Sequence, residues 1–521
     1  MTHLLFDPSR ASLRAARWLA LSLLALGVQT LGACACDSPC VVGQPCQDGS
    51  ACELVAGSEA PQCVSPFEVH GAVTRSDDQA PIEGAEVVAI DAAGVVLGEV
   101  AITDADGAYV LRVSAPRDDA GAPAAGTVTL RVSAQGYERF PFGLRRPLPI
   151  DLGAAVEGEG TWVYTGTPAQ VALNPLPAGD RGWISGQLSG DQAAGALVTA
   201  AVDREPSGLT GVSDLNGNYT IYNVPVGTYI VRAYAKGAAL APATGVEVIA
   251  DTEASADLSG EGAQALGSIE GQVQPVAGGC SAGTSVVLVP RESLPPGTSF
   301  PLTAVSPIRG EVPRGLRAPE PPQAPTLSGS YRIEGVPAGV YEVLAAYENE
   351  AEPCVYDPSN TGGAFFVHEA TLPEGDNFDL VVPGFKVTGA VELVGPGAAG
   401  TETVNTLAPT FEWAPYASWK NYQLAVYDSN GAQLWVTTIC ADGDSGCAFD
   451  HKVIYGQPGA GSSSPALAPA LQSETLYQWR VIVMGSKAGK TCGFAGVEIA
   501  DRECISLSED LAGIFKTPVN Q

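Results

Sequence analysis

Residues 219–231 read YTIYNVPVGTYIV, and residues 331–343 read YRIEGVPAGVYEV. The two stretches share the pattern Y-x-I-x-x-V-P-x-G-x-Y-x-V, in which apolar residues alternate with other residues on both sides of a Pro and a Gly. Alternation with a period of two predicts half-buried β-strands. The Pro and the Gly predict a tight turn between the two strands, with the Gly free to adopt a positive φ. A motif that recurs at this length also indicates a chain built from similar modules.

The same series of strands occurs once more, nearer the N-terminus. Residues 69–73 read VHGAV, residues 81–90 read PIEGAEVVAI, residues 103–113 read TDADGAYVLRV, and a late GY stands at 136–137. The other two copies open with ISGQL at 184–188 and IEGQV at 269–273. An opening GxV, a PxxGAxV strand, a T-D-x-x-G-x-Y turn and a late GY resemble the carboxypeptidase regulatory-like family. The resemblance implies a small transthyretin-like β-sandwich for each copy.

The three copies are expected at residues 67–177, 181–260 and 266–384. The first match covers about residues 67–150, and its tail at 161–177 is either an edge strand or a linker. The third copy contains a Pro- and Arg-rich insertion at 295–325, which we expect to be a loop that is either functional or disordered.

The C-terminal segment, residues 385–521, has a different pattern. It contains PTFEW at 409–413, YQLAVY at 422–427 and YQWRVIV at 477–483. These strands resemble the fibronectin type III-like domains of bacterial surface proteins. Trp413 and Trp479 are then expected to fill the core. The predicted fold class is therefore all-β: tandem Ig/transthyretin-like β-sandwiches on a short disulfide-rich stalk.

The N-terminus has the layout of an export signal at residues 1–33. Arg10, Arg14 and Arg17 precede the apolar segment 18–28, which is too short for a comfortable membrane-spanning helix. The segment ends in LGAC at 31–34, which resembles the lipobox of bacterial lipoproteins. The resemblance implies cleavage before Cys34, lipid attachment to Cys34, and a membrane partner reached through that lipid. Ala35 in the next position implies passage to the outer membrane.

Cysteine usage fits an exported, oxidised chain. Without Cys34, eleven cysteines remain, and five of them crowd into the expected stalk at 34–66, at positions 36, 40, 46, 52 and 63. One of these five should be unpaired or joined to another molecule. Proximity suggests that the others pair as Cys280 with Cys354, Cys440 with Cys447, and Cys492 with Cys504. A zinc site in the stalk is the alternative, although the spacing contains no CxxC and the nearest histidine is His70.

Composition restricts the partners. The formal net charge of −30 at pH 7 repels phosphate backbones, so nucleic acid is not expected as a partner. After cleavage, the histidines His70, His368 and His451 are far apart in sequence, and neither a zinc-peptidase motif nor a G-x-S-x-G elbow is present. We therefore predict that the protein is not an enzyme and has no cofactor, with calcium as a possible exception.

The calcium candidates are the oxygen-bearing residues of two glycine turns, Asp104 with Asp106 and Asp214 with Asn216. The alternative is that these residues only favour the turn by bonding to the backbone. The third copy has LSGS at 327–330, without a carboxylate, which favours this scaffold role.

The leading hypothesis for function is a lipid-anchored cell-envelope protein with a non-catalytic binding, adhesion or scaffold role. The alternative is a carbohydrate-binding surface protein, which would need exposed aromatic side chains such as Trp162, Trp183 or Trp435. Less favoured is an accessory to, or a member of, an envelope hydrolase system. The expected partners are the membrane, through the lipid, and a surface glycan or an envelope protein.

Overall fold

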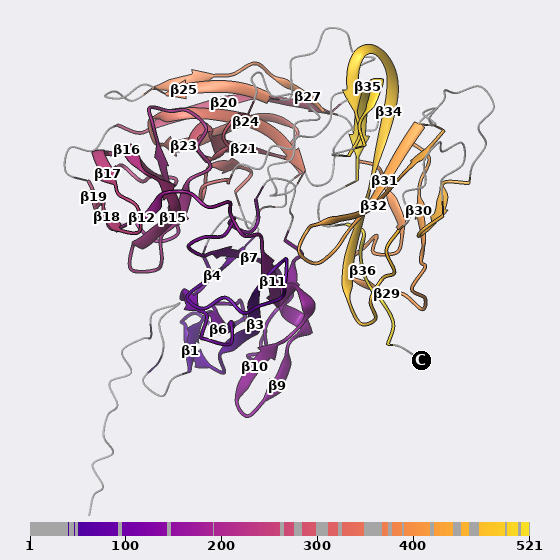
Figure 1. Cartoon of the computed structure of the whole chain (residues 1–521), viewed down its shortest axis with the longest axis horizontal. Helices are drawn as coiled ribbons and strands as arrows, with labels where there is room; N and C mark the ends of the chain where they lie inside the picture. The colour runs from indigo at the N-terminus through magenta and orange to yellow at the C-terminus, as the bar shows by residue number, and fades with distance from the viewer. Residues whose placement is uncertain are drawn as a thin grey trace, which may run out of the picture. The chain divides into compact units, whose positions relative to one another are not determined.

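The computed structural model describes residues 40, 46, 50–91, 96–142, 147–190, 192–260, 265–275, 284–298, 311–320, 323, 326–347, 367–372, 378–387, 390–416, 421–440, 450–457, 468–494, 497–508 and 512–519. All of them belong to one compact unit, Cys40–Gln521. Regular structure in these ranges consists of strands and three short 3-10 turns, so the predicted all-β class is confirmed (Figure 1). No helix in the described part of the chain is long and apolar enough to cross a membrane.

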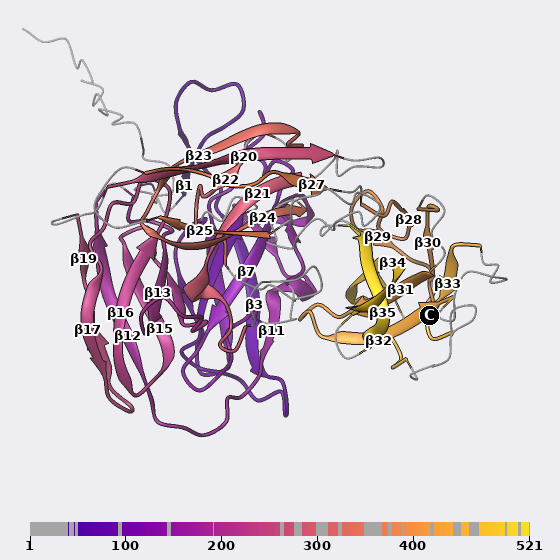
Figure 2. The ribbon, with the colours of Figure 1, turned by 90° about the horizontal axis from the view of Figure 1, so that it is seen from above.

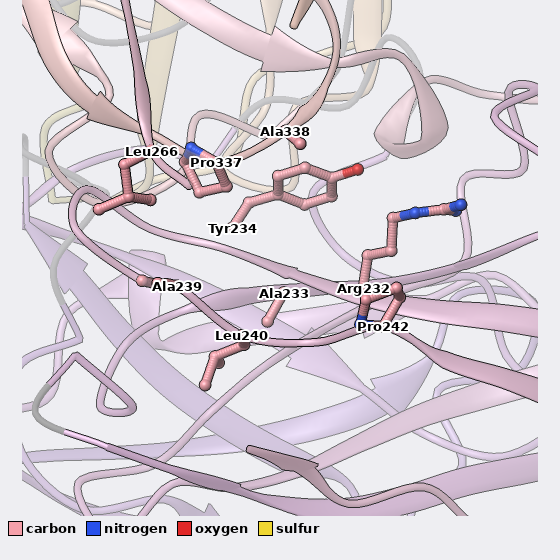
Figure 3. A pocket seen from close by; sticks show the side chains of 10 residues that line it. Arg232, Ala233, Tyr234, Ala239, Leu240, Pro242, Leu266, Pro337 and Ala338 are labelled. Atoms are coloured by element: carbon pink, nitrogen blue, oxygen red, sulfur yellow. The ribbon is translucent and has the colours of Figure 1, made fainter. Parts of the chain in front are cut away.

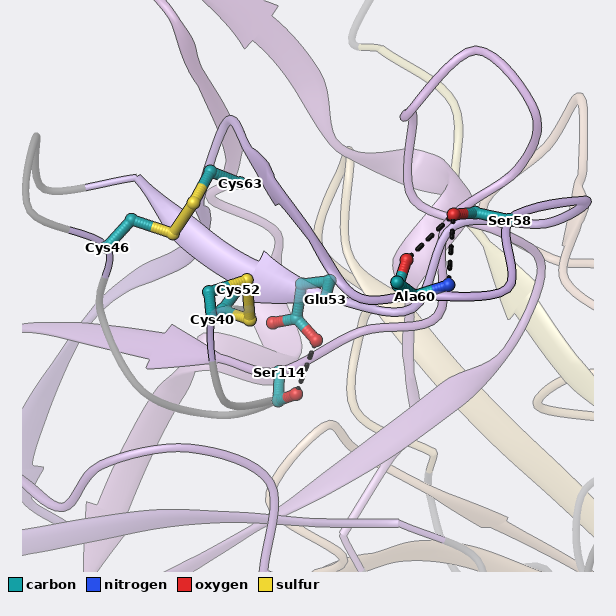
Figure 4. The surroundings of a disulfide bond; sticks show 8 residues. All are labelled: Cys40, Cys46, Cys52, Glu53, Ser58, Ala60, Cys63 and Ser114. Atoms are coloured by element: carbon teal, nitrogen blue, oxygen red, sulfur yellow. Dashed lines mark hydrogen bonds between the residues drawn. A yellow bond between two sulfur atoms is a disulfide. The ribbon is translucent and has the colours of Figure 1, made fainter. Parts of the chain in front are cut away.

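The stalk contains a small antiparallel hairpin of β1 (Ala51–Glu53) and β2 (Gln62–Val64). Disulfides join Cys40 to Cys52 and Cys46 to Cys63, and Cys52 and Cys63 lie opposite each other in the hairpin (Figure 4). A segment this short has little core of its own, so these two bonds supply much of its stability. The fifth cysteine of this group, Cys36, lies outside the described residues, so the prediction of one unpaired cysteine in the stalk stays a prediction.

The first repeat is a sandwich of two sheets. In one, β6 (Ala108–Val113) and β3 (Phe67–Arg75) are antiparallel. Strands β10 (Thr161–Tyr164) and β11 (Gln170–Leu173) are parallel to β3 on its other side, and β9 (Val156–Gly158) pairs with β10. The tail at 161–177 thus supplies an edge strand, β11, and a second strand, β10, so it is not a linker. The other sheet has the order β5 (Ala101–Ile102), β4 (Glu86–Asp91), β7 (Thr127–Ser133) and β8 (Ile150–Asp151).

The second repeat has the same plan (Figure 2). Its first sheet contains β12 (Arg181–Ser189), β15 (Asn218–Pro225), β18 (Glu253–Ser255) and β19 (Leu258–Ser259). Its second sheet has the order β14 (Thr210–Val212), β13 (Leu197–Ala201), β16 (Gly227–Tyr234) and β17 (Ala243–Val248).

The third repeat follows the plan again. Its first sheet contains β20 (Gly267–Pro275), β23 (Gly329–Val336), β26 (Asp379–Val381) and β27 (Phe385–Val387). Its second has the order β22 (Arg317–Ala318), β21 (Thr284–Pro290), β24 (Gly339–Tyr347) and β25 (Val367–Leu372). Strand β22 lies within the insertion at 295–325 and pairs with β21. The expectation of a loop is therefore wrong for this part of the insertion.

The repeated motif Y-x-I-x-x-V-P-x-G-x-Y-x-V does not form a hairpin. Strands β15 and β16 belong to different sheets of one sandwich, and so do β23 and β24, so the V-P-x-G step carries the chain from one sheet to the other. The positive φ falls earlier than predicted, at Asn223 (60°) and Gly335 (69°), where the pairing with β12 and β20 contains a bulge. The Gly of the turn serves another purpose: a Cβ on Gly339 would lie 3.0 Å from the ring of Tyr341. That tyrosine donates its hydroxyl to the carbonyl of Pro337 (2.7 Å).

In each repeat, the glycine of the opening strand packs against the first tyrosine of the later strand. Gly71 and Tyr109 are cross-strand partners, as are their counterparts Gly186 with Tyr219 and Gly271 with Tyr331. The Tyr109 ring lies across the glycine and donates its hydroxyl to Ala169 O (2.8 Å). A Cβ on Gly71 would lie 2.6 Å from that hydroxyl and 2.0 Å from the same carbonyl. Only glycine fits at this position, which explains the recurring GxV.

The C-terminal domain is a separate sandwich. One sheet has the order β28 (Leu393–Gly395), β30 (Thr410–Trp413) and β33 (Lys452–Ile454). The other contains β29 (Glu402–Thr403), β36 (Ile514–Lys516), β34 (Leu476–Cys492), β31 (Asn421–Tyr427), β32 (Gln433–Ile439) and β35 (Ile499–Leu507). Trp413 and Trp479 are 1% and 0% exposed in its core, which confirms their predicted role.

Candidate functional site: the interface of the three repeats

The residues that the sequence singled out for lipid and disulfide chemistry are described only in part. Cys34, Cys280, Cys354 and Cys447 lie outside the described residues. A disulfide joins Cys492 to Cys504, the pair that sequence proximity suggested, and Cys440 is disulfide-bonded.

The calcium candidates form backbone-bonded turns. Asp104 Oδ1 accepts hydrogen bonds from the N–H groups of Asp106 (3.0 Å) and Ala108 (2.9 Å). Asp214 Oδ1 does the same with Asn216 (2.8 Å) and Asn218 (2.7 Å). Asp118 and Asp428 form turns of the same geometry. The carboxylates thus already have a structural role, and calcium binding at these turns stays a prediction.

One group of potential metal ligands stands out among the described residues: Cys40, Cys46 and Cys63, whose sulfur atoms lie within 4.8 Å of one another. All three sulfurs belong to the two disulfides of the stalk. In this oxidised form they cannot act as the thiolates that zinc requires.

The candidate aromatic and histidine residues are dispersed. Trp435 is 3% exposed and cannot serve as a binding platform, whereas Trp162 and Trp183 are partly exposed. His70 pairs with Glu68 (2.9 Å) on β3 of the first repeat. His451 packs edge-on against Trp413 and Tyr422 in the C-terminal domain, where burial lowers its pKa. The side chain of His368 lies outside what the structure describes.

The residues that the structure does bring together join the three repeats, and none of them stood out in the sequence. Glu311 comes from the insertion of the third repeat. Its carboxylate pairs with Arg131 Nε (2.7 Å) and with Arg139, both from the first repeat. It also accepts a hydrogen bond from the Thr210 hydroxyl of the second repeat. Burial alone would raise the pKa of Glu311, but the two arginines hold it at about 2.

Arg131 is the centre of this cluster. Its side chain is 2% exposed, and besides Glu311 the guanidinium donates to the carbonyl of Thr210 (2.9 Å) and to the Ser133 hydroxyl (3.1 Å). A buried guanidinium with this many acceptors is geometrically fixed, because each of its three nitrogen atoms has a defined partner. The first and second repeats are therefore held at a defined position by one side chain.

A second carboxylate, this one fully buried, joins the third repeat to the second. Glu292 follows β21, in the turn η3 (Arg291–Ser293), and is 2% exposed. It accepts from Arg232 (2.9 Å) and from the hydroxyls of Thr199 and Tyr234 (3.1 Å). Burial, and then the charge of Glu292, raise the pKa of Tyr234.

Side chains close to Glu292 make further contacts between the second and third repeats. The Tyr234 ring packs edge-on against Tyr341 of the third repeat at a centroid distance of 5.8 Å. Tyr234, Arg232 and Pro337 also border a small pocket between these two repeats (Figure 3).

The bulge of the motif provides a recurring contact between repeats. Asn223 Nδ2 donates to the carbonyls of Ala134 and Tyr137 (both 2.8 Å), the second of which belongs to the late GY of the first repeat. The equivalent Gly335 of the third repeat accepts from the Gly237 N–H (2.8 Å) of the second repeat. At the corresponding end of β6 the stalk is bound, because Ser114 donates to Glu53 (2.7 Å) (Figure 4). Each repeat thus contacts the preceding part of the chain through the same region, the C-terminal end of the strand that carries the first tyrosine of the motif.

The sequence matches no family model and no curated protein. Among solved structures, the major pilin subunit BcpA of Bacillus cereus is similar over 61% of this chain and 99% of its own, with 12% identity and a TM-score of 0.17. A DUF3823 family protein from Bacteroides uniformis is similar over 46% of this chain and 99% of its own, with 15% identity and a TM-score of 0.20. A minor pilin of Streptococcus agalactiae is similar over 41% and 99%, with 11% identity and a TM-score of 0.18. Scores this low add nothing to the fold, which is established by the sheets themselves.

Proposed function

We propose that the protein is a non-catalytic scaffold of the cell envelope, attached through a lipid on Cys34, in which the three repeats act as one rigid block. The observation that carries the scaffold role is the position of Glu311, which is half-buried between two arginines of the first repeat and Thr210 of the second. A carboxylate from the third repeat that is bonded to both other repeats opposes their independent motion.

The contacts between the repeats support a block rather than a string of separate domains. Val88 and Val96 of the first repeat, with Leu197 and Tyr234 of the second, pack in the same apolar cluster as the core of the third repeat. Domains joined by flexible linkers share few such contacts. A rigid block holds its outward loops at fixed spacings, which suits a scaffold or adhesion role.

Attachment through Cys34 rests on the sequence LGAC at 31–34. The test is fractionation of cells that express the native chain or the Cys34→Ser variant. We expect the native chain in the membrane fraction with a mass increase of a lipid on Cys34, and the variant released from the membrane. An unmodified Cys34 thiol in the native chain would refute the anchor.

Carbohydrate binding stays a prediction. Trp162 and Trp183 are partly exposed, but they belong to strands of different sandwiches.

A further inference from the structure

The two disulfides of the stalk, Cys46–Cys63 and Cys40–Cys52, lie close together (Figure 4). The sulfur atoms of Cys40, Cys46 and Cys63 are all within 4.8 Å of one another, so both sulfurs of the first bond are close to one sulfur of the second. Disulfides exchange when a thiolate attacks a sulfur of another disulfide. A thiolate freed from Cys46–Cys63 therefore has Cys40 within its reach.

The two bonds differ in their access to solvent. Cys63 is exposed, whereas Cys52 is 1% exposed. The rate of exchange depends on which sulfur is attacked and on how accessible that sulfur is. An external thiol should therefore attack Cys63 first and leave Cys46 as the freed thiolate.

The hairpin that these bonds cross-link contacts the first repeat directly after β1. Arg117 N–H donates to the carbonyl of Leu54 (3.2 Å), and Ala56 N–H donates to the carbonyl of Arg117 (3.0 Å). Glu53, the last residue of β1, is 3% exposed and accepts the hydrogen bond from Ser114. We call this contact, formed by residues 53–56 with Ser114 and Arg117, the stalk joint.

Arg117 makes the closed stalk joint costly. Its side chain is 2% exposed, and in the part of the chain that the structure describes none of its three guanidinium nitrogens has a hydrogen-bond partner. A buried cation is expensive unless it is paired and hydrogen-bonded, because burial removes its hydration. Opening the joint would hydrate the guanidinium, so Arg117 favours the open state, and the cross-links that keep the hairpin folded oppose opening.

We propose that Cys63 is a site of attack by external thiols, and that exchange passes from it to Cys40–Cys52 and opens the stalk joint. First, the thiolate of a small thiol attacks Cys63 Sγ, the Cys46–Cys63 bond breaks, and a mixed disulfide forms on Cys63. The Cys46 thiolate then attacks Cys40 Sγ, and the Cys40–Cys52 bond breaks. Cys52 leaves as a thiolate and takes up the proton that the external thiol lost. One thiol is consumed and one thiol appears, so the sequence needs no other reductant or oxidant.

The new bond changes what the cross-links hold. Cys40–Cys46 lies entirely before β1 in the chain, so neither strand of the hairpin remains cross-linked to another part of the protein. A hairpin this short depends on its cross-links, and without them it should separate from the first repeat. The proposal goes beyond the scaffold role and does not depend on the lipid anchor.

The test maps disulfides in the chain from residue 34 onward, with Cys34→Ser and Cys36→Ser so that these two thiols take no part. The protein is treated with reduced glutathione, trapped with iodoacetamide and digested for mass spectrometry. We expect glutathione on Cys63, a Cys40–Cys46 cross-link and alkylated Cys52. The internal control is Cys492–Cys504, whose residues are 0% and 5% exposed and which should stay intact.

A variant without the exposed disulfide separates the relay from direct attack on Cys40. In Cys46→Ser/Cys63→Ser, alkylation of Cys52 at the same glutathione concentration should be at least about 10-fold slower. An equal rate would overturn the relay. So would alkylated Cys46 beside an intact Cys40–Cys52 bond in the parent chain, a result that does not depend on how the variant folds. Absence of glutathione from Cys63 would overturn the site itself.

Hydrogen exchange, measured before trapping, reports on the stalk joint through the amides of Ala56 and Arg117. Their protection should fall at least about 10-fold once Cys52 is released. Unchanged protection would show that the joint stays closed, and the proposed opening would be wrong. In Arg117→Met the fall should be smaller, because a methionine side chain regains no hydration on opening; an equal fall would overturn the role given to Arg117.

Discussion

Glu311→Gln tests whether a single carboxylate holds the three repeats together. The substitution keeps the shape of the side chain but removes its charge. It leaves the guanidinium groups of Arg131 and Arg139, whose side chains are 2% and 10% exposed, without their anionic partner. The glutamine amide would also point N–H donors at groups that can only donate.

Two estimates of the effect agree. Lowering the pKa of Glu311 from 4.5 to about 2 corresponds to about 3 kcal/mol of stabilisation at neutral pH. Removal of one partner from a buried ion pair costs about 3–5 kcal/mol. Because the folded pKa is depressed, the contribution is present above pH 4.5 and is lost as the pH falls towards 2. The difference between the native chain and the variant should therefore shrink below about 1 kcal/mol near pH 2.5.

The assay is urea unfolding of the mature chain, followed by circular dichroism at pH 7 and at pH 2.5. The matched control is Glu320→Gln, in the same segment of the insertion. Glu320 pairs with Lys236, but both side chains are about 40% exposed, so we expect a loss of at most about 1 kcal/mol. If Glu311→Gln costs no more than Glu320→Gln at pH 7, the cluster does not hold the repeats together and the scaffold argument fails.

Two further substitutions examine the bulge and the glycine turns. Asn223→Ala removes three hydrogen bonds to the first repeat and places alanine at a φ of 60°, so we expect a loss of about 4 kcal/mol in urea unfolding. Asn223→Gly removes the same hydrogen bonds, but glycine tolerates that φ, so we expect a loss of about 3 kcal/mol. Equal losses would show that the backbone conformation costs nothing. Asp104→Ala removes the acceptor of two backbone N–H groups and should cost about 1–2 kcal/mol in calcium-free buffer, whereas Asp106→Ala should cost nothing. A melting temperature that millimolar calcium raises in the native chain but not in Asp106→Ala would instead support a calcium site.

The repeats and their strands could be predicted because local pattern determines them. The alternation around Tyr219 and Tyr331 places strands at β15 and β23, and the GxV glycine has to face the tyrosine ring of the neighbouring strand. The turn was predicted less well. A Pro and a Gly between two strands indicate a change of direction. Whether the chain returns to the same sheet or crosses to the other depends on the distant strands with which the two strands pair, β20 for β23 and β21 for β24.

The interface could not be predicted from the sequence for a different reason. Arg131 and Glu311 are 180 residues apart, and Thr199 and Glu292 are 93 apart. A glutamate in a Pro- and Arg-rich insertion looks like any solvated charge, and an arginine on alternate positions of β7 looks like part of an exposed face. Only the docking of three sheets turns these polar positions inward, and no local periodicity encodes that docking.

The interface between the three repeats contains both apolar side chains and buried charges, and the two kinds of contact have different effects on the arrangement of the repeats. The apolar contacts between the repeats are made by aliphatic side chains such as Val88 and Leu197, which tolerate small shifts in position. Buried charges do not tolerate such shifts, because a displaced Arg131 would lose Glu311 and the Thr210 carbonyl together and remain desolvated. Apolar burial thus favours association of the repeats, while Arg131, Glu311 and Glu292 restrict it to one arrangement. Replacing the cluster by aliphatic residues should therefore preserve much of the stability and lose the fixed geometry that a scaffold needs.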